Sequence, residues 1–213
     1  MANKMKTCMI IGSAPFGDSA ILKEFYAEEA YVICADGGLD TALANNITPD
    51  LIIGDFDSVH AQLPDNIETI RLPVAKDDTD MMAAIKIAFR RGYNNFVLLG
   101  ALGGRFDHSY ANLSALAYIS SLGGQAVLAD GNCKIFLVRS SRITLTAMKD
   151  CTLSVFPFGC PSCTVSYQGM LYPLTEYCLK ADVPLGVSNQ IIQDTAEITV
   201  HSGNALVVVL SET

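Results

Sequence analysis

The sequence contains no tryptophan and is poor in charged side chains, which make up only 17% of its 213 residues. Half of the residues are hydrophobic, a balance that argues against a disordered chain and predicts a well-buried core. Basic residues are also scarce: 14 lysines and arginines stand against 22 acidic residues, for a formal net charge of −8. This charge argues against nucleic acid or an anionic membrane as a partner, and it leaves cationic ligands open.

Long apolar runs are lacking as well. No run approaches the length of a membrane span, and Met1–Lys6 leads into a strand without the features of a signal peptide. The seven cysteines are odd in number and scattered, as free thiols are in a reducing compartment. We therefore expect a cytoplasmic protein without a membrane partner. Cys160–Cys163 is a lone CxxC motif, for which we expect loop thiols rather than a zinc or redox site.

The first 130 or so residues alternate short apolar runs with segments of helical period. The runs at residues 7–11, 31–35, 51–53 and 96–99 have the length and composition of buried strands. Strands that alternate with helices predict a mostly parallel sheet covered on both faces. We expect an α/β domain over residues 1–138.

The pattern changes from about Lys134, where short β-rich segments replace the helical ones. We expect strands at residues 135–138, 143–146, 152–156, 164–167, 190–193, 197–201 and 205–210. Ser202–Asn204 has the composition of a hairpin turn between the last two. The economical interpretation is an all-β, sandwich-like domain over residues 139–213.

Acidic residues gather after the strand at 51–53. Asp55 and Asp57 are two residues apart, a spacing that in an extended chain points both side chains to the same side. Asp80 opens the following helix, so it belongs to a first helical turn. Carboxylates meeting at one point repel each other by roughly 4 kcal/mol per close pair at an effective dielectric of 20. A divalent cation removes that cost, and Mg²⁺, which binds carboxylates and phosphates together, is the natural candidate.

Phosphate-binding features follow other strands of the same domain. Gly103 and Gly104 precede a helix, where backbone N–H groups and the helix N-terminus can bind an anion. Arg105 offers planar donors to phosphate oxygens, and Lys76 adds a positive charge. Because ligands bind beyond the carboxyl ends of parallel strands, we expect these residues and the acids to share one edge of the sheet.

Four motifs in this order and spacing resemble thiamine pyrophosphokinase: residues 36–38 (DGG), 54–58 (GDFDS), 76–80 (KDDTD) and 103–108 (GGRFDH). The resemblance continues more thinly through residues 169–174 and 186–190. It implies a homodimer that moves the pyrophosphoryl group of ATP onto the hydroxyethyl oxygen of thiamine and releases AMP. It further implies an ATP-binding α/β domain, and a β-sandwich domain that contributes to the thiamine pocket across the dimer interface.

The resemblance also assigns roles to residues. It implies that Mg²⁺ is held by Asp55, Asp57 and Asp80, and that the catalytic residues are Asp57, Asp80, Arg105 and Asp107. It implies that ATP and thiamine are bound by Asp36, Gly37, Gly38, Lys76, Asp77, Thr79, Gly103, Gly104, Arg105, Ser188 and Asn189. Some eukaryotic family members stack a tryptophan on thiamine; here Tyr172 or Tyr167 could replace it, or this chain lacks the stacking.

Three points stay open at the level of sequence. Asp107 and Asp36 are both candidates for the base that takes the thiamine proton, and Asp107 could instead serve as a helix cap. Asp55–Asp57 also fits the D-x-D metal motif of nucleotide-sugar transferases, although that motif would leave the other clusters unexplained. A non-catalytic module that binds nucleotide or thiamine is the third alternative.

Overall fold

A computed structural model describes residues 6–15, 19–26, 30–75 and 77–211, which form two compact units, Met1–Gly131 and Asn132–Thr213. The division lies before the expected boundary at residue 138. The strand β7 (Cys133–Arg139) belongs to the second unit because it pairs along its whole length with β14 (Asn204–Leu210). Within the described residues, none of the helices has the length and apolar character needed to cross a bilayer.

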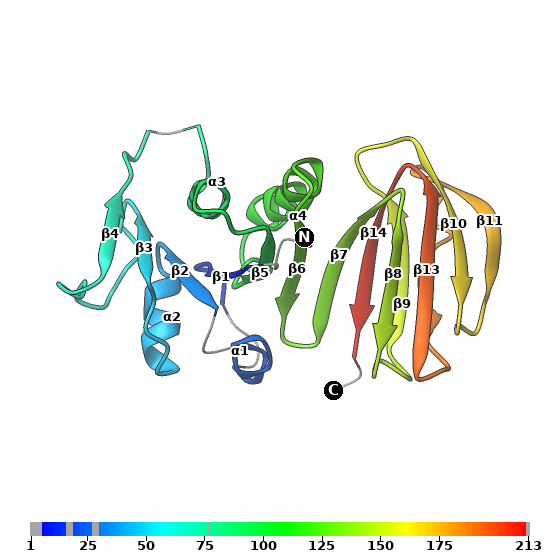
Figure 1. The fold of residues 1–213 in the computed structure, drawn as a ribbon, viewed down its shortest axis with the longest axis horizontal. Helices are drawn as coiled ribbons and strands as arrows, with labels where there is room; N and C mark the ends of the chain where they lie inside the picture. Colours follow the sequence, from blue (N-terminus) through cyan, green and yellow to red (C-terminus); the bar gives the residue numbers. More distant parts are fainter. Residues whose placement is uncertain (1–5, 16–18, 27–29, 76, 212–213) are drawn as a thin grey trace. The chain divides into compact units, whose positions relative to one another are not determined.

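The first unit alternates strands and helices, as expected (Figure 1). Its elements are β1 (Thr7–Ile11), α1 (Ala20–Phe25), β2 (Tyr31–Ala35), α2 (Gly38–Ala44), β3 (Leu51–Gly54), β4 (Glu68–Arg71), α3 (Asp80–Arg90), β5 (Asn95–Leu99), α4 (Phe106–Ser121) and β6 (Gln125–Asp130). The strands are parallel and lie in the order β6-β5-β1-β2-β3-β4. The prediction of a parallel sheet is confirmed.

Both faces of this sheet are covered, α1 and α2 lying on one face and α3 and α4 on the other (Figure 1). Side chains alternate between the faces along each strand: Met9 and Ile11 of β1 pack with Leu22 of α1 and Leu39 of α2. The central strands are therefore apolar on both sides. Burial of both faces fixes the strands' register and holds the loops at their carboxyl ends in place.

The strand order creates a crevice at one edge. From β1 the chain proceeds through β2, β3 and β4 in one direction, and then β5 returns to the other side of β1. The loops after β1 and β5 thus diverge to opposite faces of the sheet. Such a switch point is where open α/β sheets bind ligands.

The second unit consists of two layers of antiparallel strands. Its further elements are β8 (Arg142–Thr146), β9 (Thr152–Pro157), β10 (Ser162–Gln168), β11 (Leu174–Lys180), β12 (Asn189–Gln190) and β13 (Thr195–Ser202). One layer has the order β12-β9-β14-β7 and the other β11-β10-β13-β8. Inward-facing side chains of both sheets, among them Val155, Val165, Ile198 and Val207, form one buried cluster. The predicted sandwich-like arrangement is confirmed.

Three local predictions for this unit were wrong. The turn Ser202–Asn204 does not close a hairpin, because β13 and β14 belong to different sheets and the turn carries the chain from one to the other. Strand β11, which has no clear alternation, was not expected. Of the segment 190–193, only Gln190 lies in a strand, the two-residue β12, and Ile191 forms an isolated bridge with Met170.

The turn between β13 and β14 gives a test of this architecture. Gly203 has a positive φ of 78°, and a Cβ atom there would lie 2.5 Å from the carbonyl oxygen of Ser162. Gly159 has a similar φ of 66° but open space around it. We expect Gly159→Ala to lower the free energy of unfolding by about 1 kcal/mol, from backbone strain alone. Gly203→Ala adds the collision and should cost about 3 kcal/mol. Urea unfolding measures both, and equal losses would contradict this account of the turn.

Candidate functional site

A cavity of about 640 Å³ opens in the first unit at the carboxyl ends of its strands. Its walls come from the residues that follow β1, β2, β3 and β5, together with the loop before α3 and the first turns of α4. The predicted site residues among its lining are Asp36, Asp55, Asp57, Asp77, Thr79, Asp80, Gly103, Gly104 and Arg105. Most of the residues that the sequence assigned to the nucleotide thus lie around one cavity.

Three carboxylates converge in this cavity. Asp36, Asp55 and Asp57 each offer an oxygen within 4.8 Å of the other two, and within the described residues they are the one group of three metal-ligating side chains. Asp36 follows β2, and the two others follow its neighbour β3. The strands approach closely here because Gly54 has no side chain: a Cβ atom on it would lie 3.1 Å from the Cα atom of Asp36.

The expected extended spacing of Asp55 and Asp57 does not occur. Strand β3 ends at Gly54, and Phe56 has a positive φ of 67°. The backbone N–H of Asp57 donates to Oδ1 of Asp55 at 3.3 Å, so a tight turn brings the two acids together. Arg71 supports the turn by donating to the carbonyl oxygen of Asp55 at 3.0 Å and covering the Phe56 ring.

Asp36 is the buried member of the group, with 9% of its surface exposed. Its Oδ2 accepts a hydrogen bond from the Ser58 hydroxyl, whereas its Oδ1 is buried without a hydrogen-bond partner. A buried carboxylate oxygen without a partner is costly. A divalent cation between the three acids would satisfy it, so the residues present fit a hard metal ion with oxygen ligands.

Asp57 is the exposed member, and its environment disfavours a second negative charge. The neighbouring Asp55 carboxylate raises the pKa of Asp57, with smaller contributions from desolvation, Asp36 and Asp80. Asp80, in the first turn of α3, thus lies near enough to act electrostatically on Asp57. The predicted ligand set was Asp55, Asp57 and Asp80, whereas the three carboxylates that converge include Asp36 instead of Asp80. Asp80 lines the same cavity. Coordination by Asp80 stays a prediction.

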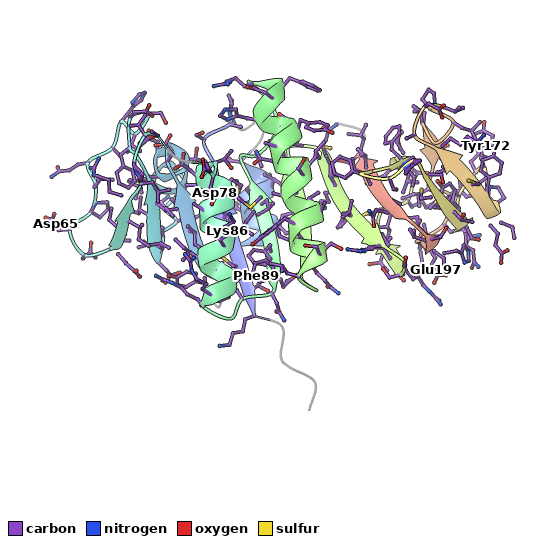
Figure 2. The ribbon with its side chains drawn as sticks, turned by 90° about the horizontal axis from the view of Figure 1, so that it is seen from above. Asp65, Asp78, Lys86, Phe89, Tyr172 and Glu197 are labelled. Carbon is purple, nitrogen blue, oxygen red and sulfur yellow. The ribbon has the colours of Figure 1, made fainter. Side chains whose placement is uncertain are left out.

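The loop before α3 is fixed by contacts that the sequence reasoning missed. Lys86 of α3 binds both carboxylate oxygens of Asp78 at 2.7 Å (Figure 2). Thr79 is the N-cap of α3, and its hydroxyl accepts from the N–H of Met82 at 3.2 Å. Lys86 follows Asp78 by two helical turns, a spacing that could have suggested the pair. Lys76 lies outside the described residues.

The glycine loop before α4 shapes the opposite wall. Gly103 and Gly104 both have a positive φ, 84° and 63°, a conformation that favours glycine. Arg105 lines the cavity and pairs with Asp107, its Nη2 lying 2.5 Å and its Nε 3.2 Å from the carboxylate oxygens. The guanidinium lowers the pKa of Asp107, which makes this carboxylate a weak base. Asp107 is not part of the cavity lining and orients Arg105.

Gly37 and Gly38 are likewise absent from the cavity lining, although both were expected to contact the nucleotide. Gly38 opens α2 against β1: a Cβ atom on it would lie 2.0 Å from the carbonyl oxygen of Ile11. It therefore allows the helix to approach the strand. The sequence reasoning also missed Asn112 of α4, which lines the cavity and donates from Nδ2 to the carbonyl of Ala101 at 2.8 Å.

Ser188 and Asn189, the predicted thiamine contacts, lie in the second unit and differ from each other. Ser188 is exposed with a positive φ of 57°, whereas Asn189 is buried. The two tyrosines also differ: Tyr172 is 63% exposed, whereas Tyr167 is 4% exposed and belongs to the core. Tyr167 therefore offers no surface for stacking.

The cysteine motif belongs to the core of the second unit. Cys163 is buried, and desolvation raises its pKa to about 11. All seven cysteines are free thiols. The expectation of two loop thiols is wrong for Cys163, which lies in β10, whereas Cys160 lies in the loop before that strand.

An acidic cavity at the carboxyl edge of a parallel sheet, with a glycine loop opposite, is typical of proteins that bind a metal-complexed phosphate. The comparisons specify the class further. The family model "Thiamin pyrophosphokinase, catalytic domain" matches residues 22–128, and "Thiamin pyrophosphokinase, vitamin B1 binding domain" matches residues 140–207. The chain belongs to the thiamin pyrophosphokinase family.

Individual proteins agree with the family models. The chain is 23% identical to Thiamin pyrophosphokinase 1 of Caenorhabditis elegans, over 94% of this chain and 86% of that protein. It is 26% identical to Thiamine pyrophosphokinase 1 of rice, Oryza sativa subsp. japonica, over 80% and 75%. The crystal structure of thiamine pyrophosphokinase from Bacillus subtilis superposes with a TM-score of 0.88, covering 98% of this chain and 100% of that one at 22% identity. At this identity the superposition shows a shared fold.

The convergence of acids predicts an unusual response to a charge-removing substitution. Asp57→Asn removes one of the like charges and leaves the turn's backbone bonds in place, so in metal-free buffer it should raise Tm at pH 7. The control Asp65→Asn changes the same charge on an exposed loop away from the cavity and should leave Tm unchanged (Figure 2). Thermal unfolding with a chelator present measures both. A lower Tm for Asp57→Asn would show that the three carboxylates do not repel each other in the folded protein.

Proposed function

We propose that the chain transfers the pyrophosphoryl group of ATP to the hydroxyethyl oxygen of thiamine, giving thiamine diphosphate and AMP, in the cavity of the first unit. The observation that carries the proposal is the meeting of Asp36, Asp55 and Asp57 around an unsatisfied buried oxygen, in a chain of this family. The vitamin B1 binding model over residues 140–207 supports thiamine as acceptor and the second unit as its binding domain. Family membership favours this function over the nucleotide-sugar alternative.

The metal is Mg²⁺, with Asp55, Asp57 and Asp80 as predicted ligands and Asp36 as a further one. When bound, it neutralises the carboxylates and the phosphate oxygens of ATP. The Ser58 hydroxyl orients Asp36, and the turn at Phe56 holds Asp55 and Asp57 close to each other. These contacts fix the positions of the three carboxylates before the nucleotide binds.

The remaining residues orient the triphosphate and stabilise the charge that develops on it. Arg105, held by Asp107, directs its free donors toward the phosphates across from the acids. The backbone around Gly103 and Gly104, together with Lys76, assists it. The thiamine oxygen attacks the β-phosphorus, and the bond from that phosphorus to the oxygen shared with the α-phosphate breaks. AMP leaves with the electron pair, and the proton of the thiamine alcohol passes to a carboxylate or to solvent.

Of the two candidate bases, Asp36 fits better than Asp107. The pKa of Asp107 is lowered by Arg105, and its carboxylate is occupied by that guanidinium. Asp36 lies in the cavity and has an unsatisfied oxygen. Asp36 would then accept the proton of the thiamine alcohol on a lone pair that the metal does not occupy, since a carboxylate has about four such acceptor sites.

The finer assignments follow the family resemblance. The chain acts as a homodimer in the cytoplasm, and the β-sandwich unit contributes to the thiamine pocket across the dimer interface. An acidic protein attracts the thiamine cation, which agrees with the net charge of −8.

The products distinguish the proposed reaction from its alternatives. With ATP, Mg²⁺ and thiamine, we expect AMP and thiamine diphosphate in equal amounts and no thiamine-dependent ADP. Product analysis by chromatography measures all three. The absence of thiamine-dependent AMP would contradict the function, and binding of both ligands without turnover would indicate a non-catalytic module.

The group of three carboxylates gives a second test of the proposed function. Asp57→Asn should lower kcat by at least about 100-fold, because a charge that stabilises the transition state through the metal is lost. The rise in Tm on adding Mg²⁺ should shrink in the same variant. Asp65→Asn serves as the matched control and should keep both properties. Near-normal activity of Asp57→Asn would remove this residue from the metal site.

A further inference from the structure

Asn189 has little capacity left to bind a ligand. Its Oδ1 accepts from the N–H groups of Tyr172, at 3.0 Å, and Gln190, at 2.9 Å. Its Nδ2 donates to the carbonyl oxygen of Tyr172 at 2.8 Å and approaches the sulfur of Met170 at 4.0 Å. An amide oxygen has two lone pairs and an amide nitrogen two hydrogens. Both lone pairs and one hydrogen are therefore used inside the protein, and the side chain is only 8% exposed.

These bonds continue a short ladder between two loops. Residues 169–171 pair with residues 190–192: Ile192 donates to the carbonyl of Gly169 at 3.0 Å, and Leu171 donates to the carbonyl of Gln190 at 2.9 Å. One residue further along, the amide of Asn189 binds both backbone groups of Tyr172, as a peptide group of a neighbouring strand would. The side chain thus fixes the backbone of Tyr172 just before Pro173.

The side chain of Tyr172 is presented outward from this fixed backbone. It is 63% exposed and lies on the surface of the second unit (Figure 2). A tyrosine ring on a rigid backbone offers a large flat contact at a low entropic cost. Thiamine has flat rings, one of them a cation, and aromatic faces attract such rings. The residue also lies within the region matched by the vitamin B1 binding model.

The family resemblance implies an aromatic contact with thiamine, and the exposed Tyr172 is the ring available for it. We propose that Asn189 is a positioning residue for this contact: it binds the backbone of Tyr172 and so fixes the direction of the ring. The inference rests on the proposed function and specifies how the second unit recognises its substrate. The neighbouring Ser188, exposed on a left-handed backbone held by a 3.1 Å bond from its N–H to the Ser154 hydroxyl, remains available for direct contact.

A double-mutant cycle tests the proposal. Steady-state AMP release by the full chain is measured for Asn189→Ala, Tyr172→Ala and the double variant, with thiamine and ATP varied in turn. We expect each single substitution to raise the thiamine KM about tenfold and to leave the ATP KM within about twofold. The double variant should match Tyr172→Ala, because Asn189 acts through that residue. Tyr172→Phe, which keeps the ring, should resemble the unaltered protein.

Tyr177→Ala is the matched control, because Tyr177 is a tyrosine of the same unit, 44% exposed on β11. The hydrogen bonds of Asn189 described above go to other residues. It should leave both KM values unchanged. Independent, multiplying effects in the double variant would identify Asn189 as a direct ligand and overturn the proposal. An unchanged thiamine KM for the surface substitution Tyr172→Ala would overturn it even if Asn189→Ala failed to fold.

Failure of the inference is distinguishable from failure of the proposed function. A chain that releases no thiamine-dependent AMP contradicts the function, whereas an active chain with unaffected variants contradicts only the role of Asn189. Calorimetric titration with thiamine compares the same variants without turnover. Loss of thiamine affinity in Tyr172→Ala but not in Tyr177→Ala would support the proposal there as well.

Discussion

The mutual repulsion of three carboxylates is the constraint on which this molecule's first unit depends. Two unit charges 4 Å apart repel by roughly 4 kcal/mol at an effective dielectric of 20. Asp36, Asp55 and Asp57 are nevertheless held together, with one Asp36 oxygen buried and unpaired. A fold that keeps such a group assembled does so through the stability of the parts around it, and the proposed Mg²⁺ would remove the repulsion.

The surrounding structure supplies that stability in identifiable ways. The central strands are buried on both faces, so the loops at their carboxyl ends start from fixed points. Gly54 lets β2 and β3 carry their acids close together. Two ion pairs hold loops around the cavity: Asp107 pairs with Arg105 in the loop before α4, and Lys86 pairs with Asp78 in the loop before α3. These pairs are at least one-third exposed, so their role is to orient side chains more than to stabilise the fold.

The second unit also contains a buried polar side chain, the amide of Asn189, whose atoms need hydrogen-bond partners. A buried asparagine has two acceptor positions and two hydrogens, and an unmet one is costly in the core. Asn189 meets this requirement on the backbone of Tyr172, which converts an irregular loop into a fixed support for an aromatic ring. A buried polar residue can thus fix the position of an exposed aromatic side chain.

The sequence by itself determined the architecture and the location of the chemistry. The α/β first unit and the β-sandwich follow from hydrophobic periodicity, and the acids follow strands because ligand-binding loops of parallel sheets do so. Tertiary structure decided which acids meet: Asp36 joins Asp55 and Asp57 only because β2 and β3 are neighbours, and strand order is not encoded in local pattern. It also decided that Ser202–Asn204 crosses between sheets, that Gly38 serves helix packing, and that Asn189 faces inward. Each of these depends on contacts between residues far apart in the chain, whereas a sequence motif records only neighbours along it.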